Sequence, residues 1–333
     1  MSLPSSQEVS DIPIDENIDE YESNYGNDLA TETTSLASTI YRYPVENGRR
    51  YHKYKEGSYW GPNDDQQNDQ LDLSHQTFLI LLDGKLFRAP ISDHPQRVLD
   101  VGTGTGIWAI DFADQYPSAE VVGTDLSAIQ PNWVPPNLRF EVDDASDEWT
   151  FQKDSFDFIH ARGLLGCIAD WPVFYSQVMA HLKPGAWYEQ VEYSVTWISD
   201  DGTVPDGHIF KEWGNIFEEA GEKNGKTFRI WALQKQYMLD AGFEEVTEHR
   251  MKMPVGPWSS DPKLKEVGKW HLIECFQGLE GWAMALLTRV MGWSPEEVQV
   301  FLARARTGLK DRKVHAYTSV SICYGKKPNT NIP

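Results

Sequence analysis

Short apolar segments alternate with amphipathic ones through the middle of the chain. The segments expected to form strands are RVLDV (97–101), EVVGTD (120–125), LRFEVDD (138–144), FDFIHAR (156–162) and AWYEQVEYSVTWI (186–198). Apolar residues at helical spacing lie between them, over 106–116 and 171–182. Strands that alternate with helices in this way predict the α/β class, a mostly parallel sheet with helices on both faces.

The pattern changes on both sides of this region. Before it, a helix is expected over 70–87, where leucines and Phe78 repeat at helical spacing. After it, we expect helices near 208–223 and 230–241, strands over 243–253 and 315–327, and two or three helices within 263–309. Ser294 precedes Pro295 and can cap one of these last helices.

The N-terminal segment differs in composition from the rest of the chain. Residues 1–40 include nine Asp or Glu and no Lys or Arg, and they show no helical or strand periodicity. Such a segment buries too little apolar surface to offset its ordering entropy, so we expect a disordered acidic tail. The remainder, 41–330, is expected to be one domain with an N-terminal lid at about 45–90 and a helical cap at about 255–310.

The chain carries a formal net charge of −20 over 333 residues. This acidity argues against nucleic acid or an anionic membrane as the main partner. The sequence has neither a bilayer-length apolar run nor a signal-peptide pattern, so we expect a cytoplasmic or nuclear protein. The cysteines and histidines lack the spacing of metal ligands, and no metal is expected.

A glycine-rich turn follows the first expected strand. In VLDVGTGTGIWAI (98–110) the glycines stand at Gly102, Gly104 and Gly106, whereas dinucleotide-binding turns have the spacing G-x-G-x-x-G. No lysine follows the third glycine, which excludes a P-loop. Glycines let the backbone turn sharply and approach a ligand closely. The turn alone leaves open whether it binds a ligand, and which one.

Acidic residues close three successive strands. Asp100 ends the first, Asp125 the second, and Asp143 and Asp144 the third. Ligands of open α/β sheets bind at the carboxyl ends of the strands, so these acids should form a line at the binding edge. A carboxylate beside the turn suits an ammonium group better than a pyrophosphate, and an acid ending the second strand can accept both ribose hydroxyls. The line of acids therefore favours a cationic adenosine ligand such as S-adenosylmethionine (SAM).

Together these motifs resemble class I SAM-dependent methyltransferases, and more narrowly the LaeA-type methyltransferases of filamentous fungi. The narrower resemblance rests on GTGTGIWAIDFADQYP (102–117), DLSAIQPNWVPPNLRF (125–140) and HLKPGAWYEQVE (181–192), within a similarity that spans roughly 45–328. It implies a Rossmann-like sheet of seven strands in the order 3-2-1-4-5-7-6, with an antiparallel seventh strand and a helical cap insertion. It also implies SAM as the cofactor.

The resemblance also implies roles for individual residues. Asp100 and Gly102 would hold the methionine end of SAM, Asp125 the ribose, and Asp144 with Ala145 the adenine, while His160 would face the sulfonium. The expected cofactor site is completed by Thr103, Gly104, Gly106, Leu126 and Asp143, with Tyr59 from the lid.

One residue stands out as a candidate catalytic base. His160 ends a strand beside the expected ligand, although a histidine there can equally serve to bond a neighbouring loop. Arg162 and Glu192 lie at similar strand ends, and for Glu192 a structural role is favoured. Methyl transfer depends largely on alignment and needs a base only when the acceptor must lose a proton.

Three functions remain open at this stage. The leading one is a SAM-dependent methyltransferase of fungal secondary metabolism that acts on a small aromatic or polyketide-like acceptor; the many aromatic residues of the second half could line its pocket. The second is a LaeA-like regulator that works through protein partners in the nucleus. The third is a protein that binds SAM but uses the sulfonium only as a fixed charge in a cyclisation.

Overall fold

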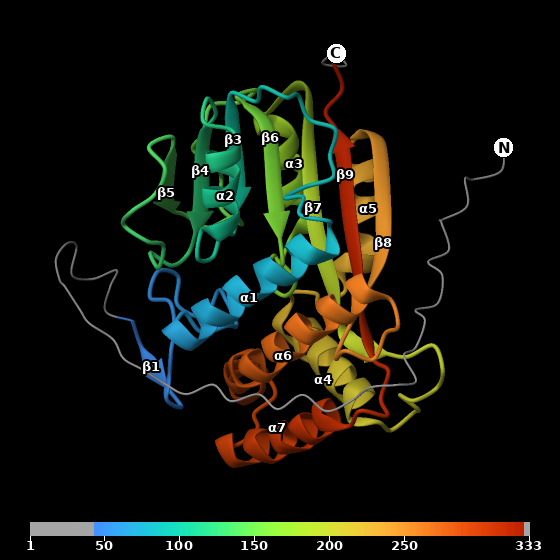
Figure 1. Ribbon diagram of the computed structural model, residues 1–333. Coiled ribbons are helices and arrows are strands. Elements are labelled where there is room, and N and C mark those ends of the chain that lie inside the picture. The colour runs from blue at the N-terminus through green and yellow to red at the C-terminus, as the bar shows by residue number, and fades with distance from the viewer. Residues whose placement is uncertain (1–42, 330–333) are drawn as a thin grey trace.

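The computed structural model describes residues 43–329 (Figure 1), so the expected acidic tail at 1–40 lies outside the described residues. The elements, in chain order, are β1 (Val45–Glu46), β2 (Arg49–Arg50), α1 (Asp65–Leu81), β3 (Arg97–Val101), α2 (Ile107–Gln115), β4 (Glu120–Asp125), β5 (Leu138–Val142), β6 (Phe156–Arg162), α3 (Trp171–His181), β7 (Leu182–Ile198), α4 (Ile209–Asn224), α5 (Ile230–Asp240), β8 (Glu244–Pro254), α6 (Pro262–Arg289), α7 (Pro295–Lys310) and β9 (Tyr317–Lys326).

Seven of the strands form one sheet in the spatial order β5-β4-β3-β6-β7-β9-β8. Numbered one to seven along the chain, they lie in the order 3-2-1-4-5-7-6, which confirms the predicted topology. Strands β3 to β7 are mutually parallel, and β9 runs antiparallel to both β7 and β8. The third predicted strand is shorter than expected: β5 ends at Val142, so Asp143 and Asp144 lie in the loop that follows it.

Helices cover both faces of this sheet. On one face, α2 places Trp108 and Phe112 in a buried cluster with Phe158 of β6. On the other face, Phe174 of α3 and Met238 of α5 belong to the main buried cluster. Burial on both faces explains why the central strands are almost continuous apolar runs.

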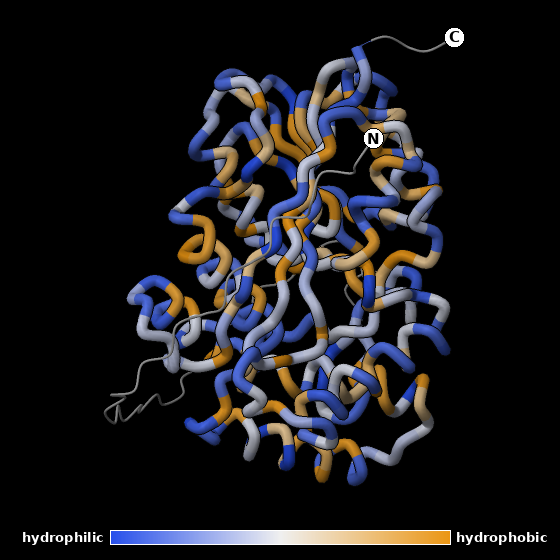
Figure 2. The backbone as a smooth tube through the Cα atoms, turned by 90° about the vertical axis from the view of Figure 1, so that its right-hand side faces the viewer, coloured by the Kyte–Doolittle hydropathy of each residue, from blue (hydrophilic) through white to orange (hydrophobic). Residues whose placement is uncertain are grey.

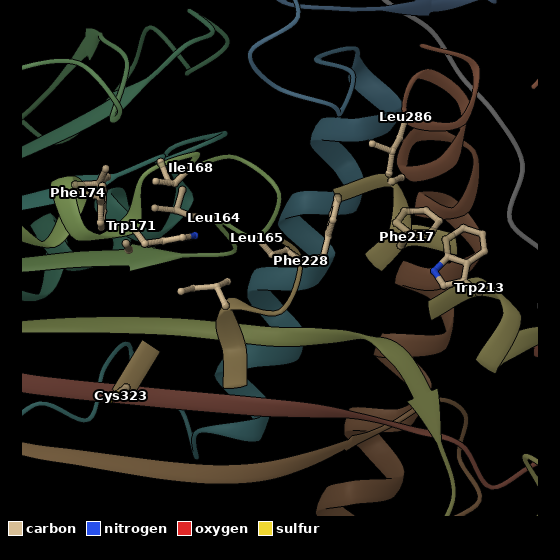
Figure 3. Close-up of a cluster of buried hydrophobic side chains, with 14 of the residues drawn as sticks. Leu164, Leu165, Ile168, Trp171, Phe174, Trp213, Phe217, Phe228, Leu286 and Cys323 are labelled. Carbon is tan, nitrogen blue, oxygen red and sulfur yellow. The ribbon is translucent and has the colours of Figure 1, made fainter. Parts of the chain in front are cut away.

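A second layer, made of α4, α6 and α7, lies beyond the carboxyl ends of the parallel strands (Figure 1). The apolar core continues into it: the ring of Trp213 stacks 5.6 Å from Trp197 and 5.4 Å from Phe301, centroid to centroid. Figure 3 shows Trp213 and Phe217 in this layer, and Leu164 and Ile168 nearer the sheet. Apolar stretches accordingly occur in both parts of the molecule (Figure 2), and this shared core fixes the helical layer to the sheet.

Two helices, α6 and α7, occupy the region where two or three were expected. They are separated by a turn in which Gly292 adopts a positive φ of 72°. Ser294 then caps α7 as predicted, because its hydroxyl accepts from the Glu297 amide (3.2 Å) and the Glu297 carboxylate accepts from the Ser294 amide (2.7 Å). No helix within residues 43–329 combines the length and apolar character that a bilayer span requires.

The first long helix differs from its prediction at both ends. It was expected over 70–87, but α1 begins at Asp65, because the Asp64 side chain accepts from the Gln67 amide at 3.0 Å and caps it. It ends at Leu81, since Asp83 and Gly84 both take positive φ values, 58° and 77°. The buried residues Leu82 and Leu86, which extended the apolar pattern, pack from the loop instead.

The buried imidazole of His271 in α6 links the pH to the stability of the fold. Its Nδ1 lies 2.9 Å from the carbonyl oxygen of Pro254, so Nδ1 carries the proton and donates. Burial lowers the pKa of His271 from 6.5 to about 4. Between pH 6.5 and pH 4 the unfolded chain therefore binds a proton at His271 and the folded chain does not. The free energy of unfolding falls as the pH falls through this range.

We expect His271→Asn to keep a donor for Pro254 while removing this titration. Between pH 7 and pH 5 the wild-type chain should lose roughly 2 kcal/mol of unfolding free energy more than the variant does. Urea unfolding of both proteins at the two pH values measures the difference. Equal losses in the two proteins would show that His271 does not titrate in this way.

Candidate active site

One cavity lies at the carboxyl ends of β3, β4 and β6, and its walls also include the loop after β5, one face of α1 and the segment 58–63. The sequence-predicted residues that line it are Tyr59, Asp100, Gly102, Thr103, Gly104, Asp125, Leu126, Asp143, Asp144, Ala145 and His160. The expected line of acids therefore exists, and all of its members face a single cavity.

The glycine turn is fixed to both neighbouring strands. The Thr103 hydroxyl donates to Asp100 Oδ2 (2.6 Å) and the Thr103 amide to the Thr124 carbonyl (2.9 Å). Gly102 and Gly104 take positive φ values of 70° and 59°, which glycine adopts without strain. This conformation brings the bare backbone of the turn to the cavity wall.

Gly106 is the one predicted cofactor residue that does not line the cavity, and its part in cofactor binding stays a prediction. It precedes α2 with a φ of 83°. A Cβ at this position would lie 2.7 Å from Cε1 of the Phe140 ring, so glycine is needed for close packing against β5. Glycine at this position lets α2 start close to the Phe140 ring.

Asp125, at the end of β4, is held by two backbone amides. Gly104 donates to its Oδ2 and Ser127 to its Oδ1, both at 2.9 Å. Burial raises the pKa of Asp125 to about 6, against the lowering effect of these donors. Each oxygen retains a lone pair for a further donor, so the ionised side chain can accept two more hydrogen bonds.

The two acids after β5 have different surroundings. Asp144 accepts from the Ser146 amide (2.8 Å) and forms an ion pair with Lys55 of the N-terminal segment (3.1 Å). Lys55 also pairs with Asp147. Asp143 receives the Asp144 amide at 2.9 Å, and burial raises its pKa. The lysine bridge, which ties the N-terminal segment to this end of the cavity, is not apparent from the sequence.

The side chain of His160 is almost fully buried in the wall of the cavity. Its Nδ1 lies 2.8 Å from Asp100 Oδ1, and its ring stacks on Trp108 with centroids 3.8 Å apart and planes within 4°. Nε2 is buried and has no hydrogen-bond partner among residues 43–329. Burial lowers the pKa of His160, which makes the imidazole neutral and a weak base near pH 7. The geometry suits a residue that positions Asp100; the predicted role as catalytic base stays a prediction.

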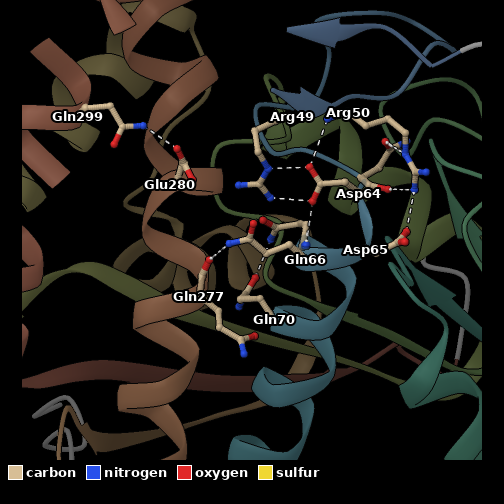
Figure 4. Close-up of polar contacts among 11 residues, drawn as sticks. Arg49, Arg50, Asp64, Asp65, Gln66, Gln70, Gln277, Glu280 and Gln299 are labelled. Atoms are coloured by element: carbon tan, nitrogen blue, oxygen red, sulfur yellow. Dashed lines mark hydrogen bonds and ion pairs between the residues drawn. The ribbon is translucent and has the colours of Figure 1, made fainter. Parts of the chain in front are cut away.

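The wall of the cavity that α1 forms was not predicted from the sequence. Gln67, Gln70 and Ser74 line the cavity at the spacing of one helix face. Gln70 accepts from Gln67 Nε2 (2.6 Å), a contact drawn in Figure 4, and it donates to Glu274 of α6 (3.2 Å). The signal in the sequence from which this wall could have been predicted is a set of polar residues at the spacing of one helix face, on a helix that otherwise packs into the core.

The segment before α1 is anchored over the cavity. Arg49 forms a two-point ion pair with Asp64, Nε to Oδ2 at 2.6 Å and Nη2 to Oδ1 at 2.8 Å (Figure 4). Asn63 donates to the Ser127 hydroxyl (3.2 Å), and Trp60 Nε1 donates to the Leu165 carbonyl (3.1 Å). These contacts place the expected lid residues at the cavity, while a lid function stays a prediction.

Of the two other strand-end candidates, Arg162 lines the cavity and Glu192 does not. Glu192 is buried and accepts from the amides of Leu164 and Leu165 (3.0 and 3.2 Å), so it supports the loop that lines the cavity. Between residues 43 and 329, no three His, Cys, Asp or Glu side chains are arranged to hold a metal ion.

Comparison with known proteins identifies the family. Residues 73–248 match the family model described as a methyltransferase domain. The chain is also 40% identical over 302 residues to methyltransferase pytC of Aspergillus terreus, a match that covers 90% of this chain and 93% of that protein. The chain belongs to the methyltransferase family.

Further relatives of this methyltransferase include two laeA proteins with different descriptions. It is 36% identical to the secondary metabolism regulator laeA of Aspergillus fumigatus, with 87% of this chain and 79% of that protein covered. It is 35% identical to the protein-methionine methyltransferase laeA of Emericella nidulans, over 86% of this chain and 77% of that protein. The predicted class, a SAM-dependent methyltransferase with LaeA-type relatives, is confirmed.

Proposed function

We propose that the cavity binds SAM along the carboxyl ends of β3, β4 and β5 and directs its methyl group to a small aromatic or polyketide-like acceptor. The observation that carries this proposal is a single cavity in which the glycine turn and the strand-end acids continue into an aromatic region. Bound SAM supplies a methyl group on a positively charged sulfonium. The protein supplies binding and alignment.

The cofactor end of the cavity fits the parts of SAM. Asp100 can accept from the ammonium group, and Asp125 has lone pairs free for both ribose hydroxyls. At the adenine end, the Ala145 amide has no acceptor among the described residues and can donate to a ring nitrogen. The carboxylates together balance the positive charge of the bound cofactor.

The other end of the cavity is suited to a flat apolar acceptor. Trp60, Phe78, Tyr193 and Trp282 line it together with Leu164. Aromatic rings bury large apolar areas and attract a neighbouring cation such as the sulfonium. This region would therefore both hold the acceptor and shield the methyl group from water.

The ionisable groups at this end are poor bases. Burial raises the pKa of Cys167 to about 12 and that of Tyr193 far above its usual value, so both stay protonated near pH 7. His160 is buried and neutral, with its Nδ1 proton held by Asp100. We therefore favour an acceptor atom that needs no proton removed by the protein, such as an already ionised phenol or enol, an amine, or a thioether.

A second function is supported by the names of two relatives. The laeA proteins are called a secondary metabolism regulator and a protein-methionine methyltransferase, and a methionine thioether is an acceptor that needs no base. A regulator in the nucleus that acts through protein partners is therefore the alternative to an enzyme that modifies metabolites in the cytoplasm. Both use the same SAM site.

Isotope transfer distinguishes these two functions. The protein is incubated with methyl-labelled SAM and an extract of a strain of the source organism from which the gene has been deleted. Label in one small aromatic compound is the expected result. Label confined to the protein fraction would instead favour the regulator, and saturable SAM binding without transfer to either fraction would contradict both.

A further inference from the structure

Arg162 places a cation in the wall of the cavity. It ends β6 and lines the cavity. It takes part in none of the ion pairs among the described residues, and its guanidinium lies over the Phe78 ring, 5.1 Å from the centroid. A guanidinium remains charged even where burial lowers its pKa, as it does for Arg162. A half-buried cation in a cavity wall, with no carboxylate of the described residues at ion-pair distance, can bind an anionic group of a ligand.

A relay of two residues fixes the direction of this guanidinium. Arg162 Nη2 donates to His75 Nδ1 at 3.1 Å. The other ring nitrogen, Nε2, lies 2.9 Å from Asp111 Oδ2 and donates to it, since arginine can only donate to Nδ1. The relay joins β6, α1 and α2 and uses one nitrogen of Arg162, which leaves the remaining donors of the guanidinium for a ligand.

Arg162 also stands at a defined distance from Asp100. In the parallel pairing of β3 and β6, Asp100 is the register partner of His160. Arg162 is two residues beyond His160 on the same strand face, which places it about 7 Å farther toward the carboxyl edge. A carboxylate and a guanidinium on the same side of this sheet edge can together receive an amino-acid group, whose ammonium and carboxylate leave the same carbon atom.

We propose that Arg162 binds the carboxylate of the methionine moiety of SAM, opposite Asp100, which takes the ammonium. This assignment rests on the proposed SAM site. His75 and Asp111 act as positioning residues, because they hold the guanidinium in place without touching the ligand. Charge balance supports the assignment: the carboxylate separates the guanidinium from the sulfonium, which would otherwise be two cations in one cavity.

Decarboxylated SAM, which lacks only the carboxylate, is the probe. Calorimetric titration should show that the wild-type protein binds SAM about 100-fold more tightly than decarboxylated SAM. Arg162→Gln should bind the two within threefold of each other, because the carboxylate has lost its partner. Arg304→Gln is the control: it removes an exposed arginine that pairs with Glu212, and it should keep the full preference.

A second variant covers the case in which Arg162→Gln does not fold. Asp111 is half-exposed, with 41% of its side chain accessible, so Asp111→Ala should fold, free His75 and reduce the preference for SAM about fivefold. Full preference in whichever of the two variants folds would overturn the assignment of Arg162 and leave the SAM site standing. A wild-type protein that binds SAM and decarboxylated SAM equally would also overturn it, and would direct Arg162 to an anionic acceptor. Binding of neither compound by the wild-type protein would contradict the SAM site itself.

Discussion

Replacing Asp125 with asparagine is expected to weaken SAM binding about 100-fold. The carboxylate is already fixed by the amides of Gly104 and Ser127, and its remaining lone pairs face the cavity. Asparagine offers one oxygen, and its amide nitrogen would face one of those two backbone donors. Hydrogen bonds to a charged group contribute roughly 1.5–3 kcal/mol each, and about 2.7 kcal/mol corresponds to 100-fold.

Calorimetric titration measures this effect, and the pH dependence provides an internal check. Because burial raises the pKa of Asp125 to about 6, SAM affinity of the wild-type protein should fall about tenfold between pH 7 and pH 5 as the carboxylate gains a proton. Asp125→Asn should lack this dependence. Glu141→Gln, a change at a partly exposed residue of β5 outside the cavity lining, is the control. Unchanged affinity in Asp125→Asn would exclude Asp125 from the site.

The second large effect concerns the stability of the helical layer. Gly268 of α6 lies against the backbone of Gly256, whose amide donates to the Gly268 carbonyl at 3.0 Å. A Cβ on Gly268 would lie 2.8 Å from the Gly256 carbonyl carbon and closer still to its oxygen. We expect Gly268→Ala to destabilise the fold by about 3 kcal/mol, because backbone cannot yield as a side chain can.

This result would run against helix propensity, since alanine in a helix is normally about 1 kcal/mol more favourable than glycine. Urea unfolding measures the change, with Lys269→Ala as the control at the next, exposed position of α6. The control should stay within about 0.5 kcal/mol of the wild-type protein. A stabilised Gly268→Ala would mean that α6 does not approach the strand end as closely as described.

The sequence predicted the sheet well for a physical reason. The central strands are buried on both faces, so RVLDV, EVVGTD and FDFIHAR stand out as apolar runs, and their bounds agree with β3, β4 and β6. The strand order came from the resemblance to a known family. The bounds of α1 were wrong, because Leu82 and Leu86 continue its apolar spacing although the chain has already turned at Asp83.

The sequence predicted the cofactor edge of the cavity but not the opposite wall. The cofactor edge follows from local signals, a glycine turn and acids at strand ends, which topology brings together. The opposite wall depends on how α1 packs against α6 and on contacts such as Lys55 with Asp144, between segments that lie far apart in the chain. Gly106 belongs to the glycine motif, but the close Phe140 ring shows that glycine is needed there for packing, which the motif alone does not indicate.

His160 illustrates how burial changes the meaning of a residue. From its position at a strand end it was a candidate base, but its ring is stacked on Trp108 and hydrogen-bonded to Asp100. A histidine held neutral in this way is better suited to orienting a carboxylate than to removing a proton. This role for His160 agrees with an acceptor that needs no base. Catalysis then depends on the alignment of the acceptor with the methyl group, and not on acid–base chemistry.

The most direct test of the account is titration of the wild-type protein with SAM and, separately, with NAD. On this account we expect saturable binding of SAM with a dissociation constant on the order of 10 µM and no measurable binding of NAD. Tight binding of NAD without binding of SAM would contradict it, because the acids at the ends of β3 and β4 would then serve a dinucleotide.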